Sequence, residues 1–152
     1  MHIADILTPN RMLCHVQATS KKRILEFFSK LLADEGQLVN SHQVFESLLA
    51  RERLGTTGLG KGVAIPHARV SACKETLAAF LQLEKGVDFD AIDRQPVDLL
   101  FALMVPEDST EEHLEILAQL AEMLSDEAFR SRLREASSCE EKFSLLTSWH
   151  SL

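Results

Sequence analysis

The sequence predicts a single α/β domain over residues 1–152, with a mixed central sheet of about five strands and helices packed on both faces. Segments with helical apolar periodicity alternate with short continuous apolar runs along the chain. No linker, repeat or low-complexity tract interrupts this alternation. A chain of 152 residues can bury about 70% of the surface that its unfolded form exposes, so it can form a core unaided.

Two amphipathic helices are expected in the first third of the chain. Residues 19–36, TSKKRILEFFSKLLADEG, carry apolar side chains at helical spacing, and Gly36 is the predicted stop. A second helix is predicted to begin near Ser41 and to end at Gly55. Its last turn would then contain Arg51.

Three apolar runs predict the strands. Pro66 confines the run over residues 62–67, GVAIPH, to a strand end or a sheet edge, because proline has no N–H to donate. Residues 77–84 and 96–106 follow as longer strands. Consecutive apolar residues in the last run predict burial on both faces, and hence a central strand.

Two more helices are expected in the last third. Ser109 and Glu112 are spaced as a capping box before HLEILAQLAEML, which predicts the start of a long helix. Residues 139–152 predict a terminal helix. This helix is expected to dock three apolar side chains on the core: Phe143, Leu146 and Trp149.

Charge and hydropathy exclude several classes of function. The net charge of −7 argues against general binding to nucleic acid or to anionic membranes, which requires clustered Lys and Arg. The longest wholly apolar run, residues 99–105, is far shorter than the roughly 20 residues that span a bilayer, so no membrane insertion is expected. Asp5 lies in the N-terminal apolar patch, so no secretory signal is expected.

The cysteines favour a reducing compartment. Cys14, Cys73 and Cys139 are odd in number and far apart, which predicts reduced core thiols rather than a disulfide framework. The protein is therefore expected to be cytoplasmic.

Four of the six glycines cluster in one short segment: Gly55, Gly58, Gly60 and Gly62. Such a cluster indicates positive φ angles or the close approach of another group. Residues 55–61, GTTGLGK, match the first seven positions of a nucleotide P-loop, but Gly62 replaces the hydroxyl that would hold magnesium. The segment also leads from a helix into a strand, the reverse of a P-loop. Val63 occupies the third glycine position of a dinucleotide fingerprint.

Metal and hydrolase sites find little support. The sequence contains no H-E-x-x-H, no C-x-x-C and no close histidine pair, so no metal is expected. Cys14 and His15 are adjacent, and neighbours on an extended strand point to opposite faces. A Ser-His-Asp hydrolase stays open on spacing alone, although no G-x-S-x-G elbow is present.

Two histidines are candidates for chemistry. Pro66 fixes the backbone before His67, so this imidazole is either a rigidly presented nucleophile or an ordinary surface histidine. His113 lies on the inward stripe of its helix, in line with Leu117, Leu120 and Leu124. In the first turn the helix dipole disfavours imidazolium by about 0.3–1 kcal/mol, so a neutral His113 could donate one hydrogen bond. The alternative is a capped core histidine.

The segment that contains Arg51 and His67 carries a resemblance to a known family. Residues 51–70, RERLGTTGLGKGVAIPHARV, resemble the active-site signature of the IIA components of the bacterial phosphotransferase system, of the fructose and mannitol type. The likeness extends over essentially the whole chain, including VDLLFALMVP and EEHLEILAQLAEML. A stand-alone chain of this length is most similar to the nitrogen-regulatory branch of the family.

The resemblance implies a phosphotransferase that acts as a phosphohistidine carrier and needs no cofactor. His67 matches the histidine that accepts a phosphoryl group on Nε2, and His113 matches the second histidine, a hydrogen-bond donor. Arg51 matches the arginine that neutralises the phosphate. Thr56 replaces a common serine and Ala68 a common glycine, and neither change touches these three roles.

The chemistry of these residue types agrees with that assignment. A guanidinium binds two phosphate oxygens at once and stays charged, and one such bond is worth about 1.5–3 kcal/mol. Lys61 and Arg69 are expected to be solvated. The loop is expected to let the phosphoryl group and its donor approach closely through Gly55, Thr56, Thr57, Gly58, Gly60 and Gly62.

The resemblance also implies partners. The expected donor is a histidine phosphocarrier protein of the NPr or HPr type, and the expected targets are proteins such as potassium transport or sensor proteins. Leu54 and Leu59 form an apolar partner rim in one interpretation and simply belong to the core in the other. Two other functions stay open: a sugar-transport IIA component that passes phosphoryl to a membrane-linked IIB partner, and a phosphorylation-independent regulatory module.

Overall fold

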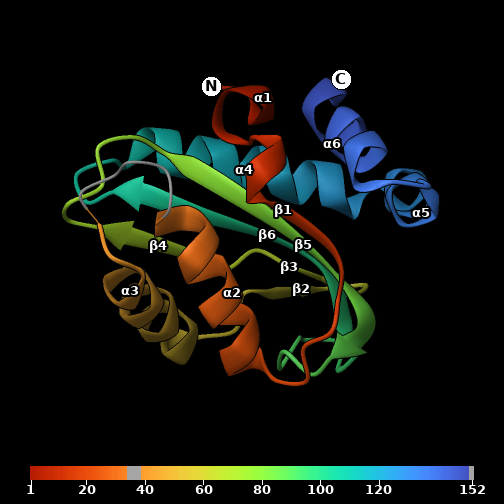
Figure 1. The fold of residues 1–152 in the computed structure, drawn as a ribbon, viewed down its shortest axis with the longest axis horizontal. Coiled ribbons are helices and arrows are strands. Elements are labelled where there is room, and N and C mark those ends of the chain that lie inside the picture. Colours follow the sequence, from red (N-terminus) through yellow and green to blue (C-terminus); the bar gives the residue numbers. More distant parts are fainter. Residues whose placement is uncertain (34–38, 151–152) are drawn as a thin grey trace.

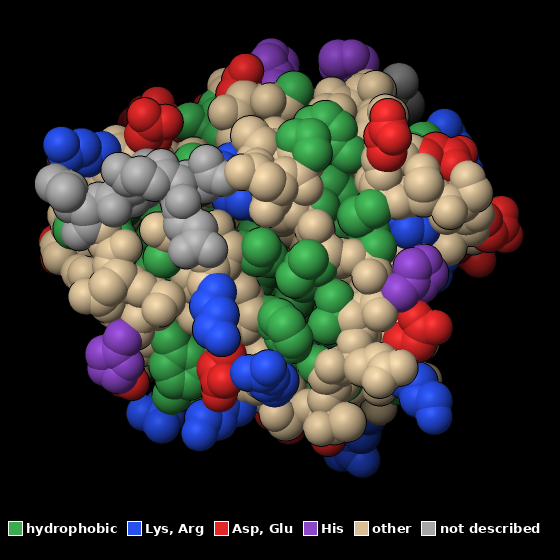
Figure 2. Space-filling model, viewed as in Figure 1, with side chains coloured by type: hydrophobic (Ala, Val, Ile, Leu, Met, Phe, Trp, Pro, Cys, Tyr) green, Lys and Arg blue, Asp and Glu red, His purple; other side chains and the backbone are tan. Residues whose placement is uncertain are grey.

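The structure is a computed structural model that describes residues 1–33 and 39–150. A twisted sheet lies between α2 (Lys21–Ala33) and α3 (Ser41–Leu54) on one face and α4 (Glu111–Ser125) on the other (Figure 1). The predicted fold class is confirmed, and the mixed sheet has six strands rather than five. On the α2 face, hydrophobic side chains gather beside that helix, with charged side chains around them (Figure 2).

The six strands are β1 (Met12–Val16), β2 (Gly58–Gly60), β3 (Val63–Ala64), β4 (His67–Val70), β5 (Leu77–Val87) and β6 (Val97–Pro106). Their order is β1-β5-β6-β3-β2, and β4 pairs with β6 beyond β3. As predicted, β6 is central: it runs antiparallel to β5 and parallel to both β3 and β4. Pro66 lies between β3 and β4, where its missing N–H costs no ladder bond.

Side chains of β6 alternate between two apolar cores. Leu100 and Met104 pack with α2 and α3, whereas Phe101 and Leu103 pack with α4 on the opposite face. This alternation explains the continuous apolar sequence of the strand, since a strand buried on both faces has no solvent-facing positions.

The remaining helical segments lie at the chain ends. They are α1 (Ile3–Ile6), a 3-10 turn (Pro9–Arg11), α5 (Glu127–Glu135) and α6 (Cys139–Ser148). Helix α5 was not predicted, and its inward face carries only Phe129 and Leu133 as buried apolar residues. The side chain of Asp126 caps this helix by accepting from the N–H groups of Ala128 and Phe129.

Helix boundaries agree with prediction in one case and differ in another. Helix α3 runs from Ser41 to Leu54, and Gly55 follows as its C-cap. The capping box at Ser109 is wrong, because Thr110 is the N-cap of α4 and its side chain makes no capping bond. Glu112 is therefore the second helical residue rather than the third, and Ser109 donates its N–H to Pro106 in a turn. The predicted stop at Gly36 lies outside the described residues.

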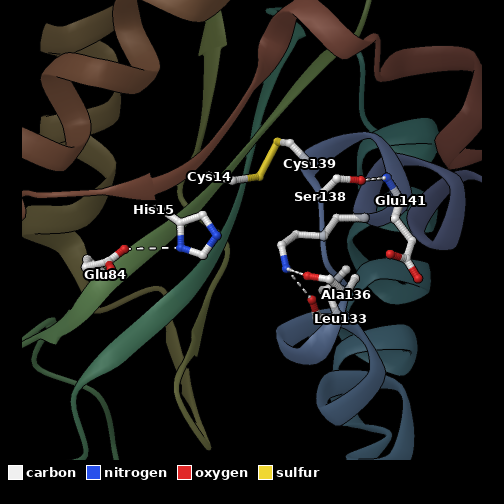
Figure 3. Close-up of a disulfide and its surroundings, with 9 residues drawn as sticks. Cys14, His15, Glu84, Leu133, Ala136, Ser138, Cys139 and Glu141 are labelled. Atoms are coloured by element: carbon white, nitrogen blue, oxygen red, sulfur yellow. Dashed lines mark hydrogen bonds and ion pairs between the residues drawn. A yellow bond between two sulfur atoms is a disulfide. The ribbon is translucent and has the colours of Figure 1, made fainter.

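The expectation of three reduced thiols is wrong for two cysteines. Cys14 of β1 and Cys139 of α6 form a disulfide, with their Cα atoms 5.8 Å apart (Figure 3). The two cysteines are 125 residues apart, so their spacing did not predict the disulfide. The disulfide depends on how α6 packs beside β1. Cys73 is a buried free thiol. Since disulfides are rare in the cytosol, the cysteines no longer support the cytoplasmic prediction.

No helix within residues 1–33 and 39–150 is long and apolar enough to cross a membrane.

Candidate functional site

His67 is the first residue of β4, and it lines a cavity to which α3 and α4 also contribute residues. Ala68 and Val70 of this strand belong to the core under α2 and α3. Because alternate side chains on a strand point to opposite faces, His67 and Arg69 extend toward α4. The ring of His67 is accordingly next to the ring of His113, with centroids 5.2 Å apart.

Two hydrogen bonds define the protonation of the His67 ring. Nδ1 lies 2.8 Å from the Ile65 carbonyl, which can only accept, so Nδ1 carries the hydrogen. Nε2 accepts from Nε of Arg51 at 3.2 Å and therefore keeps its lone pair. Burial lowers the pKa of His67 below 6.5, and the bond to Ile65 opposes this. The charges of Arg51 and Arg69 add to the lowering of the pKa, whereas the charge of Glu52 opposes it. The imidazole is thus neutral at neutral pH, with its hydrogen on Nδ1 and its lone pair on Nε2.

His113 carries a hydrogen-bond donor that no described residue uses. The residue is 6% exposed, and its Nδ1 accepts from Nε of Arg69 at 3.4 Å, so the neutral ring carries its hydrogen on Nε2. Burial, followed by the nearby His67, Arg69 and Arg51, lowers its pKa from 6.5 to about 4. Nε2 is buried and finds no hydrogen-bond partner in the described part of the chain. A buried donor without a partner is costly, so a bound acceptor would relieve a penalty.

Two guanidinium groups flank the histidines. Arg51 is held by a bond from Nη1 to the Gly55 carbonyl at 2.8 Å, in addition to its bond to His67. Arg69 is exposed, as predicted, but it also contacts His113, which the sequence analysis missed. Its position two residues after His67 on the same strand could have revealed it, because such residues share a face.

These side chains surround a cavity of about 540 Å³. Its lining residues are Ser47, Ala50, Arg51, Leu54, His67, Ala68, Arg69, His113, Leu114 and Leu117. Leu54 is 85% exposed and Leu114 is 66% exposed, so the cavity has an apolar rim. Leu59 is 49% exposed and does not line this cavity. The alternative that Leu54 and Leu59 both belong to the core is therefore wrong.

The glycine segment has internal reasons for its composition. Gly60 and Gly62 adopt φ angles of 95° and 82°, which residues with side chains rarely adopt. None of the four clustered glycines lines the cavity, and Thr56 and Thr57 direct their hydroxyls to Phe89 and Glu52 instead. Close approach of a partner along this segment stays a prediction.

The structure thus brings Arg51, His67 and His113 together and adds Arg69 to them. Within residues 1–33 and 39–150, no group of three His, Cys, Asp or Glu side chains is arranged to hold a metal ion.

Similar known proteins belong to the phosphotransferase system. The model of the family described as "Phosphoenolpyruvate-dependent sugar phosphotransferase system, EIIA 2" matches residues 5–149. A nitrogen regulatory protein of Pseudomonas aeruginosa is 49% identical over 146 residues, which cover 96% of this chain and 95% of that protein. The nitrogen regulatory protein of Escherichia coli strain K12 is 44% identical over 150 residues, 97% of this chain and 90% of that protein.

A solved structure shows the same architecture. The crystal structure of nitrogen regulatory protein IIA-Ntr from Neisseria meningitidis has a TM-score of 0.91 at 44% identity, covering 95% of this chain and 99% of that one. The chain belongs to the EIIA 2 family of the phosphoenolpyruvate-dependent sugar phosphotransferase system, and its relatives include the nitrogen regulatory proteins.

Proposed function

We propose that this protein is a phosphohistidine carrier of the nitrogen-related phosphotransferase system and that Nε2 of His67 is the phosphoryl acceptor. Family membership supports a role in phosphoryl transfer. The observation that carries the assignment is the bond between Nδ1 of His67 and the Ile65 carbonyl, which leaves the lone pair on Nε2. That nitrogen lies beside the Arg51 guanidinium.

The proposed transfer moves one phosphoryl group between two histidines. The Nε2 lone pair of His67 attacks the phosphorus, the N–P bond of the donor phosphohistidine breaks, and its electron pair returns to the donor ring. The hydrogen on Nδ1 stays where it is, bonded to Ile65. Because such transfers pass through a loose transition state, the protein mainly has to position the groups and neutralise charge.

Neutralisation is assigned to Arg51 and hydrogen bonding to His113. The bond from Arg51 to Nε2 would pass to a phosphoryl oxygen as the N–P bond forms. The unpartnered Nε2–H of His113 would donate to another oxygen. Each charge-assisted bond is worth about 1.5–3 kcal/mol, which corresponds to a factor of about 10 to 150 in rate.

Labelling from phosphoenolpyruvate tests the proposal. The protein is incubated with the first enzyme of the system and a histidine phosphocarrier protein of the NPr or the HPr type, and incorporated phosphoryl is measured. His67→Ala is expected to reduce labelling to background. His15→Ala is the matched control, because that side chain is 64% exposed on β1, and it should label normally. Undiminished labelling of His67→Ala would overturn the assignment.

The same assay separates the branches of the family. Similarity to a fructose-specific EIIA component of Haloferax volcanii, 37% identical over 141 residues, favours sugar transport as the second candidate. Preference for an NPr-type donor and no transfer to a IIB protein would support the nitrogen branch. Absence of labelling by either donor would indicate a phosphorylation-independent regulatory module.

The proposed function includes the regulation of target proteins. The phosphorylation state of His67 would control the binding of cytoplasmic targets, with potassium transport or sensor proteins as candidates. The exposed rim residue Leu54 is placed to contact such a partner or the donor, because it borders the cavity that contains His67.

A further inference from the structure

Glu52 is a buried acidic residue next to the site but outside its cavity. It is 7% exposed, and its carboxylate accepts hydrogen bonds from the backbone N–H of Thr57, at 2.8 Å, and from the Thr57 hydroxyl. Nζ of Lys21 lies 2.9 Å from the same carboxylate and supplies the opposite charge. Three contacts therefore converge on one side chain that does not touch the reacting nitrogen.

One path leads from this carboxylate to Nδ1 of His67. Thr57, held by Glu52, accepts the N–H of Ile65 on its carbonyl at 3.0 Å. Ile65 in turn accepts from Nδ1 of His67 at 2.8 Å. The Ile65 carbonyl, which selects the His67 tautomer, thus belongs to a residue that is bonded to Thr57. Glu52 in turn holds Thr57.

A second path leads to Nε2. The N–H of Gly55 donates to the backbone carbonyl of Glu52 at 3.2 Å, and the Gly55 carbonyl accepts from Arg51 at 2.8 Å. Arg51 then donates to Nε2 of His67 at 3.2 Å. The turn over residues 55–57 therefore connects both nitrogens of the ring to the end of α3, and Glu52 binds the far end of that turn.

We infer that Glu52 is a positioning residue for phosphoryl transfer: by clamping Thr57, its carboxylate keeps the hydrogen of His67 on Nδ1 and Arg51 beside Nε2. This inference rests on the proposed function, because the tautomer matters only if Nε2 is the nucleophile. A buried charge is costly to keep, and clamping two donors of one residue is a use that an apolar side chain could not serve.

The ring nitrogens of His67 report directly on this role. We would record ¹⁵N spectra of the imidazole in the full-length, unphosphorylated protein and measure phosphoryl acceptance of the same samples. Wild type should show the Nδ1–H form. Glu52→Ala should raise the population of the Nε2–H form and slow acceptance by about tenfold or more, the scale found when outer supporting residues are lost.

Two variants separate positioning from stability. Glu52→Gln should restore the wild-type tautomer, because an amide oxygen can accept the Thr57 N–H while the amide nitrogen donates to its hydroxyl. Lys21→Met removes the ion pair and lowers stability but leaves both Thr57 bonds, so its ¹⁵N spectrum should match wild type. Wild-type ¹⁵N shifts in folded Glu52→Ala, or a tautomer change in Lys21→Met as large as in Glu52→Ala, would overturn the inference.

A milder variant covers the case in which Glu52→Ala does not fold. Thr57→Ala removes the hydroxyl bond but keeps the backbone bond, so it should shift the tautomer in the same direction by less. No shift in that variant would also overturn the inference. Absence of labelling at wild-type His67, together with a tautomer that depends on Glu52, would refute the proposed function and the role of Glu52 in phosphoryl transfer, and would leave only its control of the tautomer. Normal labelling with a tautomer that does not depend on Glu52 would refute the positioning role alone.

Discussion

Two buried basic side chains in this molecule differ in whether their hydrogen-bond donors find partners within the protein. Lys142 of α6 is fully buried, and its Nζ donates to the carbonyls of Leu133 and Ala136, each at 2.9 Å, near the end of α5 drawn in Figure 3. His113 of α4 is almost as buried, but its Nε2 has no partner in the described part of the chain. Desolvation lowers the pKa of both groups. The difference lies in the hydrogen bonds: those of Lys142 join two helices, whereas His113 keeps one donor open for a ligand.

Lys142→Met should have the largest effect, and on stability alone. Each carbonyl that loses its donor costs about 1–3 kcal/mol, so the variant should lose about 2–6 kcal/mol of unfolding free energy. Denaturant titration measures this loss, and Lys85→Met, on an exposed position of β5, is the matched control. Phosphoryl acceptance at His67 should not change under conditions where the variant is folded. If Lys142→Met slowed phosphoryl transfer without losing stability, the proposed difference between Lys142 and His113 would be wrong.

His113→Ala should show the reverse pattern. Loss of one charge-assisted bond of about 1.5–3 kcal/mol predicts a 10- to 150-fold slower acceptance of phosphoryl, measured in a stopped labelling time course. The unfolding free energy should fall by less than in Lys142→Met, because the deleted ring accepts one long bond from Arg69, at 3.4 Å, and its Nε2–H bonds to no described residue. His42→Ala, whose side chain is 83% exposed, serves as the control. If the rate equals that of wild type, the open donor has no role in transfer.

A pH dependence of stability is also expected. The pKa of His113 is about 4 in the folded chain and near 6.5 when unfolded, so between these values the unfolded state binds more protons. Stability should therefore be constant above about pH 6.5 and fall as the pH approaches 4. His67, whose pKa is also lowered, adds to the same trend. The unfolding free energy of His113→Ala, measured by denaturation, should fall less between pH 6.5 and pH 4 than that of wild type. Parallel pH curves would contradict the lowered pKa of His113.

Local patterns predicted much of the fold and part of the site. Helical periodicity identified α2 and α3, a continuous apolar run identified β6, and the A-I-P-H segment directed attention to His67. Helix α5 was missed because a nine-residue helix with two buried apolar positions has too weak a pattern. Arg69 was assigned to solvent because its contact with His113 joins residues 44 positions apart.

The long helices α2, α3 and α4 and the strands β5 and β6 follow from the sequence, because apolar patterning acts locally, whereas β1, β2 and α5 were not predicted. The sequence also drew attention to His67 after Pro66, but it placed this residue at the end of a strand over residues 62–67, whereas the structure places it at the start of β4. The packing in three dimensions places β4 beside β6 and next to a cavity that α3 and α4 both line, so that Arg51, Arg69 and His113 surround that imidazole. The Cys14–Cys139 bridge belongs to the same category. Such contacts depend on how sheet and helices pack, which no spacing along the chain encodes.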